Sequence, residues 1–125
     1  MTQTPAVLLA AEPQLFVTDL DRARAFYVEG LGFEVAFAYG EPPFYMQVRR
    51  GGAALNLRRL DAMPAGREEE PDLLAATLTV DDARKLYSEF EGRRLAFHQP
   101  LRREPWGAWT FMVADPDDNL LCFAG

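Results

Sequence analysis

The chain has 125 residues, the usual size of one domain, and 49% of them are hydrophobic, which is enough for a packed core. Its formal net charge of −6 disfavours nucleic acids and anionic membranes as partners, since both require a basic protein surface. A single cysteine cannot form an internal disulfide, and the apolar stretch at residues 6–11 is too short to span a bilayer. We therefore expect a cytoplasmic protein, whose acidic surface permits a cationic small ligand.

The first half of the chain predicts an extended arm, a strand, a helix and three further strands. The arm is expected at residues 1–11, the first strand at 14–17 and the helix at 19–29. The three further strands are expected at 33–39, 44–50 and 53–58. Thr18 or Asp19 is placed to cap the helix, and Gly30 is placed to end it. Large apolar residues alternate with small or charged ones over 33–39, which is the period of a strand. The pair Gly51-Gly52 predicts a hairpin turn.

The second half of the chain repeats this order after a charged linker at residues 61–72. Strands are expected at 73–80, 95–98, 109–113 and 120–123, a helix at 81–91, and a loop at 100–105. Asp81 is placed to cap the helix and Gly92 to end it. Residues 115–119 are Asp, Pro and Asn, which favour a turn between the last two strands.

The two halves are an internal repeat of the form β-α-β-β-β. Residues 23–29 match 83–89, which places Phe26 and Leu86 at equivalent core positions. One such unit buries only one face of its helix, so two units must pair within the chain or between chains. We expect a single domain, 1–125, with one module at about 12–60 and the other at about 73–125.

Several stretches of the sequence resemble a known superfamily. They are residues 19–33, with Phe26-Tyr27 and Leu31-Gly32-Phe33, then Pro105-Trp106-Gly107 and the turn at 115–120. The chain resembles the vicinal-oxygen-chelate superfamily, which includes glyoxalase I, extradiol dioxygenases, fosfomycin-resistance transferases and bleomycin-resistance proteins. The resemblance implies an α+β fold in which two βαβββ modules form a curved mixed sheet with the helices on its outer face.

The stretch at 104–107, Glu-Pro-Trp-Gly, is most similar to the bleomycin-resistance branch. Proteins of that branch are dimers that sequester a cationic drug in clefts between two chains and perform no chemistry. The resemblance therefore implies a homodimer that binds a small molecule. We further predict that the apolar arm at 6–11 crosses to the partner chain in this dimer.

Enzymes of the superfamily hold a divalent metal at four positions, which the resemblance places at Glu12, Asn56, Ala75 and Cys122. Three or four converging oxygen or nitrogen ligands are needed for such a site. Glu12 is a good ligand, whereas Asn56 is a weak one, Cys122 is a soft one and Ala75 is none. We therefore expect no metal and no other cofactor.

A metal-free pocket would use hydrogen-bonding groups and aromatic walls to hold a ligand, cationic or aromatic in kind. The expected ligand-binding residues are Glu12, Phe37, Asn56, His98, Trp106, Trp109 and Cys122. No catalytic residue is expected, since the only histidine, His98, lacks an identifiable third partner for a Cys122 thiol. Two alternatives remain at this point: a glyoxalase-type or dioxygenase-type enzyme whose metal ligands lie elsewhere in the chain, and a regulatory ligand-sensing domain.

Overall fold

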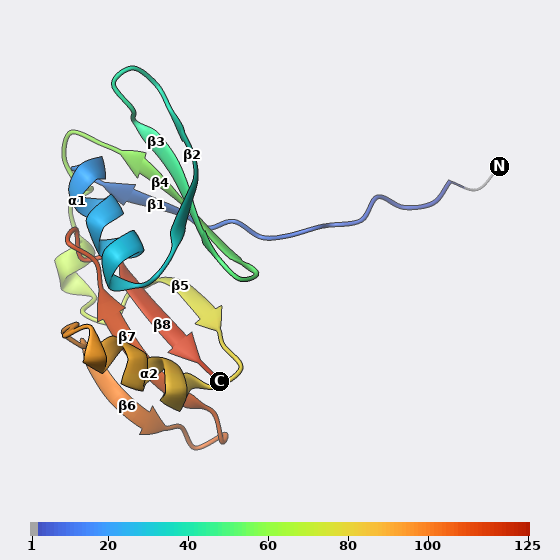
Figure 1. The fold of residues 1–125 in the computed structure, drawn as a ribbon, viewed down its shortest axis with the longest axis vertical. Coiled ribbons are helices and arrows are strands. Elements are labelled where there is room, and N and C mark those ends of the chain that lie inside the picture. The colour runs from blue at the N-terminus through green and yellow to red at the C-terminus, as the bar shows by residue number, and fades with distance from the viewer. Residues whose placement is uncertain (1–2) are drawn as a thin grey trace.

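The computed structural model describes residues 3–125, except for the side chain of Glu68, and it contains two βαβββ modules (Figure 1). The first sheet has the order β1 (Gln14–Val17), β4 (Ala53–Arg59), β3 (Tyr45–Arg50) and β2 (Glu34–Tyr39). The second has the order β5 (Leu74–Thr79), β8 (Leu120–Ala124), β7 (Trp109–Ala114) and β6 (Gln99–Arg103). In both sheets the first pair is parallel and the others are antiparallel, which confirms the predicted α+β fold.

Each module has one helix that begins at an aspartate cap. The first is α1 (Leu20–Arg24), where Oδ1 of Asp19 accepts a hydrogen bond from the backbone N–H of Arg22 at 3.1 Å. The second is α2 (Ala83–Gly92), which Asp82 caps through the N–H of Lys85 at 3.1 Å. The prediction of Asp81 as the cap was therefore one residue early, because both aspartates suit that position chemically.

The first helix continues beyond α1 as a π-helical segment, Ala25–Gly30. There the N–H of Leu31 donates to the carbonyl of Phe26, five residues back, at 3.0 Å. This wider turn shifts the side chain that faces the core by one residue toward the C-terminus. Tyr27 is therefore fully buried, and Phe26 is half-buried. In α2 it is Leu86 that is buried, so the predicted equivalence of Phe26 and Leu86 was wrong.

The helices also end later than predicted. After each helix the chain turns away at a residue with left-handed backbone. This residue is Gly32, at φ 78°, after the first helix and Arg94, at φ 61°, after the second, in place of the predicted Gly30 and Gly92. The wider turn accounts for the first shift, because it lengthens the first helix before the chain can turn away.

Strand β6 lies where a loop was predicted, and residues 95–98 are not part of it. Pro100 made a strand look unfavourable, but β6 is an edge strand, where the missing N–H of a proline faces away from the ladder. The pairing between β6 and β7 shifts between Gln99 and Arg102, which accommodates the irregular backbone.

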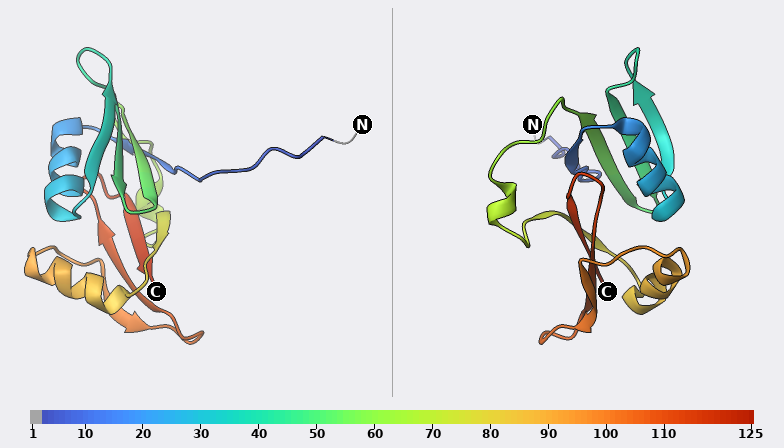
Figure 2. Two further views of the ribbon diagram at one scale, coloured as in Figure 1. Left: turned by 45° about the vertical axis from the view of Figure 1, so that its right-hand side comes forward. Right: turned by 90° about the vertical axis from the view of Figure 1, so that its left-hand side faces the viewer.

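Both helices lie on the same side of the two sheets (Figure 2). One core of buried residues joins the modules on that side, with Leu15 and Tyr27 from the first and Phe90 and Phe111 from the second. Hydrogen bonds from the β7–β8 turn strengthen the junction. For example, Nδ2 of Asn119 donates to the carbonyl of Phe16 at 2.8 Å.

The opposite side of each sheet has no helix over it, and we call it the helix-free face. The arm at residues 3–11 extends away from the modules and is exposed along its whole length (Figure 1). Within the described residues, no helix is long and apolar enough to cross a membrane.

Candidate ligand-binding site

The helix-free face of the first module presents a buried amide pair. Gln47 on β3 lies directly opposite Asn56 on β4, while their neighbours Val48 and Leu55 point into the core. Nε2 of Gln47 donates a hydrogen bond to Oδ1 of Asn56 at 2.9 Å. Gln47 is only 6% exposed, so this bond satisfies a polar group that would otherwise be costly to bury.

An aromatic surface adjoins this amide pair on β2 and β3. Phe37 pairs with Gln47 across the sheet and stacks on Tyr45, with ring centroids 6.1 Å apart and planes 17° apart. Phe37 is nevertheless 46% exposed, which is high for a phenylalanine on a sheet. Glu12 lies just before β1, and its Oε2 is 3.9 Å from a guanidinium nitrogen of Arg49.

Cys122 occupies the same place in the second sheet as Asn56 does in the first. Gln14 on β1 pairs with Asn56, and Thr77 on β5 pairs with Cys122 in the same parallel arrangement. The neighbour Phe123 points into the core, so Cys122 faces the helix-free side. Burial raises the pKa of the Cys122 thiol, and the negative charge of Glu104 raises it further.

Next to Cys122 lies a polar group of residues that we call the Glu104 network: Gln99, Arg102, Glu104 and Thr110. Oε1 of Glu104 accepts hydrogen bonds from the hydroxyl of Thr110 and from Nε of Arg102, both at 2.7 Å. Nε2 of Gln99 donates to the Thr110 hydroxyl at 3.1 Å. These bonds from Arg102 and Thr110 hold the pKa of Glu104 below its ordinary value.

The Glu104 network was not among the features predicted from the sequence. The available signal was Thr110, a single polar residue between Trp109 and Phe111 in a strand. Because side chains alternate along a strand, Thr110 must face away from the core side that Phe111 occupies. It is only 5% exposed, so a hydrogen-bonding partner on that face was to be expected.

The remaining predicted residues lie in three separate places. Trp106 lies in the turn between β6 and β7 and is 76% exposed. Trp109 is on the core side of β7, where the guanidinium of Arg84 on α2 lies 5.2 Å from its ring centroid. Nε2 of His98 is 3.0 Å from Oδ1 of Asp72 in the linker.

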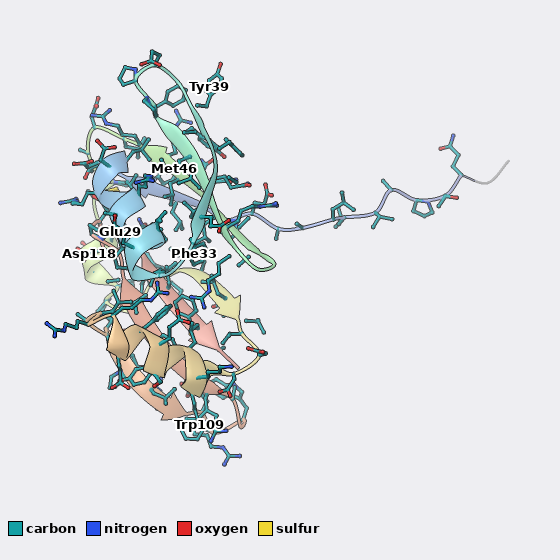
Figure 3. All side chains as sticks on the ribbon, viewed as in Figure 1. Glu29, Phe33, Tyr39, Met46, Trp109 and Asp118 are labelled. Carbon is teal, nitrogen blue, oxygen red and sulfur yellow. The ribbon has the colours of Figure 1, made fainter. Side chains whose placement is uncertain are left out.

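The predicted aromatic walls Phe37 and Trp109 belong to different modules and are far apart within one chain. Tyr39 is on β2, the strand that also holds the predicted wall Phe37, and it lies at the opposite end of the molecule from the predicted wall Trp109 (Figure 3). Within one chain the predicted aromatic walls therefore do not meet.

The predicted residues are nearly absent from the walls of two cavities in the described part of the chain. The larger, of about 760 Å³, runs along β5 between the modules, and none of the seven predicted residues lines it. Its walls are mainly apolar and include Phe33, Leu78 and Phe90. The smaller, of about 480 Å³, lies between the linker and the β7–β8 turn and is lined by only one of the seven, His98.

The four positions that the resemblance assigned to metal ligands differ in chemistry. Ala75 has no donor atom, and Oδ1 of Asn56 already accepts a bond from Gln47. Across residues 3–125, leaving aside the side chain of Glu68, no three His, Cys, Asp or Glu side chains are grouped closely enough to hold a metal ion.

Two βαβββ modules with bare helix-free faces define the class of protein to which this structure belongs. The model of the Glyoxalase/Bleomycin resistance protein/Dioxygenase superfamily matches residues 8–123, so the chain belongs to that superfamily, as the resemblance predicted. No curated protein sequence gives a significant match.

Solved structures of the same fold include a protein that binds bleomycin. A glyoxalase/bleomycin resistance protein/dioxygenase from Alicyclobacillus acidocaldarius is 27% identical, with a TM-score of 0.74 over 91% of this chain and 88% of that one. The bleomycin-binding protein of Streptomyces verticillus, in complex with copper(II)-bleomycin, is 26% identical, with a TM-score of 0.74 over 95% and 97%. The bleomycin resistance determinant of transposon Tn5, at 23% identity and a TM-score of 0.75 over 94% and 97%, shows the shared fold.

Proposed function

We propose that the protein binds and sequesters a small organic molecule, in the manner of a bleomycin-binding protein and without a metal of its own. The observation that supports this most directly is the chemistry of the four candidate ligand positions. Ala75 supplies no donor, and the donor oxygen of Asn56 is engaged by Gln47. This set does not fit a divalent ion, which needs three or four converging ligands. The likeness to the protein that binds copper(II)-bleomycin favours the same class of ligand.

The binding site in this proposal forms between two chains. Each helix-free face has hydrogen-bonding groups, and the first also has exposed rings, but neither of the two cavities described above is lined by Glu12, Phe37, Asn56 or Cys122. In the proposed homodimer the first module of one chain faces the second module of its partner. The cleft then places Glu12, Phe37 and Asn56 opposite Cys122 of the other chain, with Trp106 at the rim. Trp109 lies on the core side of its sheet and His98 beside the linker, so both are outside this cleft.

The arm supports the proposed dimer. Leu8 is 98% exposed and Leu9 is 92% exposed, although both are strongly apolar. The outer edge of β5 has no strand beside it within the described residues, and the apolar cavity of about 760 Å³ runs along that edge. Open edges and apolar clefts are places where a further strand adds. We propose that the arm of the partner chain lies there.

The biological role in this proposal is drug sequestration in the cytoplasm. A dimer of this kind lowers the concentration of free drug by binding it, so resistance requires no turnover. The single cysteine is compatible with a reducing compartment, since no disulfide within the chain is needed for stability.

Calorimetric titration tests the proposal. The protein is treated with EDTA, freed of chelator by gel filtration, and titrated with metal-free bleomycin and with copper(II)-bleomycin. We expect binding of one ligand for each chain, unchanged by the EDTA treatment. A thermal-shift screen of other glycopeptide drugs and aromatic cations accompanies the titration. Stoichiometric zinc, manganese, iron or nickel in the untreated protein, with loss of activity or binding after EDTA, would instead establish the enzyme alternative.

A further inference from the structure

The direction of the hydrogen bonds among Glu104, Thr110 and Gln99 is fixed by the Glu104 carboxylate. A carboxylate accepts hydrogen bonds and donates none. Glu104 stays ionised near neutral pH, because bonds from Arg102 and Thr110 hold its pKa low. The single hydroxyl proton of Thr110 must therefore point to Oε1 of Glu104, at 2.7 Å.

The side-chain orientation of Gln99 follows from the same constraint. Since the proton of the Thr110 hydroxyl is used, that oxygen can only accept a bond from Gln99. The amide nitrogen of Gln99 therefore faces Thr110, donating to its hydroxyl at 3.1 Å and to its carbonyl at 3.5 Å. The amide nitrogen is then engaged by Thr110, and the oxygen Oε1 of Gln99 is left as a free acceptor.

Two acceptor oxygens thus remain beside one hydroxyl: Oε2 of Glu104 and Oε1 of Gln99. Neither has a partner among the described side chains and backbone groups. The Glu104 side chain is 9% exposed, and Gln99 is also 9% exposed. In the described part of the chain no fully buried side-chain oxygen lacks a partner, so both oxygens reach the surface of the helix-free face. Cys122 and Met112, which pair across β7 and β8, offer only sulfur beside them.

We infer that the Glu104 network is a subsite that selects ligand groups with N–H donors, such as a primary ammonium, an amidinium or a guanidinium. The inference rests on the proposed function and specifies which chemistry the proposed cleft recognises. Two free acceptors beside the Thr110 hydroxyl match a group that donates two hydrogen bonds.

Selection at this subsite depends on hydrogen bonding more than on net charge. The guanidinium of Arg102 bonds Oε1 of Glu104, so the pair is close to neutral as a whole. A quaternary ammonium has the same charge as a primary ammonium but has no N–H to donate. It leaves both acceptors without a partner once the cleft closes over them, which is costly for buried polar groups.

A matched pair of probes tests this inference directly. Naphthylmethylammonium and its N,N,N-trimethyl analogue have the same ring and the same charge and differ in N–H donors. Their dissociation constants are measured by calorimetry with the full-length protein. We expect the primary ammonium to bind about ten-fold to a hundred-fold more tightly than the trimethyl analogue, as for hydrogen bonds to a charged group.

Substitutions locate the effect. Glu104→Gln removes the charge and converts one acceptor to a donor, so we expect it to lower the affinity for the primary ammonium to that of the trimethyl analogue. Thr110→Val removes the hydroxyl that positions Glu104, so it should also lower the affinity for the primary ammonium. Thr110→Ser keeps the hydroxyl and should retain the preference for the primary ammonium. The control is Glu91→Gln, an equal change of charge at an exposed position of α2. Thermal unfolding of each variant establishes that it is folded.

The outcomes separate this inference from the proposed function. If copper(II)-bleomycin binds but the two probes bind with equal affinity, the inferred subsite is wrong and the proposed function stands. The same conclusion follows if Glu104→Gln has no more effect on the affinity for the primary ammonium than Glu91→Gln has. If neither the drugs nor the probes bind the natural chain, both are wrong. A preference for the primary ammonium that Glu104→Gln abolishes and Thr110→Ser retains supports the inference.

Discussion

The hydroxyl of Tyr27 donates a hydrogen bond of 2.7 Å to Oδ2 of Asp115, and this bond joins the two modules inside the core. Tyr27 is fully buried and Asp115 is 3% exposed. The carboxylate accepts three further bonds, from the backbone N–H groups of Asp117 and Asn119 and from Nδ2 of Asn119. Burial raises the pKa of both Asp115 and Tyr27. The β7–β8 turn of the second module is thus held against the helix of the first.

Replacing Tyr27 by Phe should destabilise the fold measurably. The change leaves the packing nearly intact but leaves a buried carboxylate one donor short, so we expect the free energy of unfolding to fall by about 1–3 kcal/mol. Urea unfolding measures this. The control is Tyr39→Phe, since Tyr39 is 68% exposed and its hydroxyl has no partner among the described residues. Equal stability of the two variants would mean that the Tyr27–Asp115 bond contributes nothing.

A second contact between the modules predicts a pH dependence of stability. Arg50 at the end of β3 makes two hydrogen bonds to Glu89 on α2, at 2.8 and 2.9 Å. These bonds hold the pKa of Glu89 below its ordinary value of 4.5. The unfolded chain therefore takes up this proton at a higher pH than the folded chain does. The stabilisation is complete above about pH 4.5 and is lost as the pH falls through the lower pKa of the folded state.

The variant Glu89→Gln isolates this contribution. Because both side chains are about one-third exposed, we expect it to be only about 0.5–1 kcal/mol less stable than the natural chain at pH 7. The difference should shrink as the pH is lowered below 4.5, which urea unfolding at several pH values can follow. Glu91→Gln, at an exposed position of the same helix, should show no such trend. A difference that grows on acidification would contradict the assignment.

Much of the fold was predictable because its local signals agree with its tertiary structure. The alternation over 33–39 and the turn at Gly51-Gly52 gave β2 and the β3–β4 hairpin close to their observed bounds. Where prediction was wrong, a tertiary or helical detail decided the outcome. The π-helical segment moved the buried position from Phe26 to Tyr27, and the edge location of β6 made Pro100 acceptable in a strand.

The candidate site was less predictable than the fold. Counting from sequence landmarks placed Asn56 and Cys122 at equivalent points of the two sheets, and the pairing of the strands agrees with this. The Glu104 network depends on contacts between the end of β6 and β7, for which the position of Thr110 within its strand is only an indirect local signal. The orientation of Trp109 follows from its alternation with Thr110, and it is set by the packing of Phe111 on α2.

Removal of the arm should weaken the proposed dimer. Deleting residues 2–11 removes Leu8 and Leu9, which are almost fully exposed in the single chain and would be buried against a partner. We expect the natural chain to sediment as a dimer at micromolar concentration and the deletion variant to shift toward monomer. Replacing Leu8 and Leu9 by Ser in the full-length chain should have the same effect without shortening it. A natural chain that sediments as a monomer would contradict the dimer.

The last prediction concerns the two tryptophans, which lie on different sides of the second module. Trp106 is 76% exposed in the β6–β7 turn, within two residues of Glu104. In the proposed cleft it would cover the ring of a ligand whose N–H group reaches the Glu104 network. Trp106→Ala should therefore weaken binding of bleomycin by about 1–3 kcal/mol, as the loss of an aromatic anchor does. It should leave the free energy of unfolding nearly unchanged, because the side chain buries little surface in the free protein.

Trp109→Phe is the matched control for this prediction. Trp109 packs on the core side of β7 beneath Arg84, so its replacement should lower stability while leaving the affinity for the ligand unchanged. Calorimetric titration and urea unfolding of both variants separate the two effects. If Trp109→Phe weakened binding while Trp106→Ala did not, the ligand would lie on the helix-bearing side of the second sheet. The proposed cleft between helix-free faces would then be wrong, because the core side of β7 is closed to the partner chain in that arrangement.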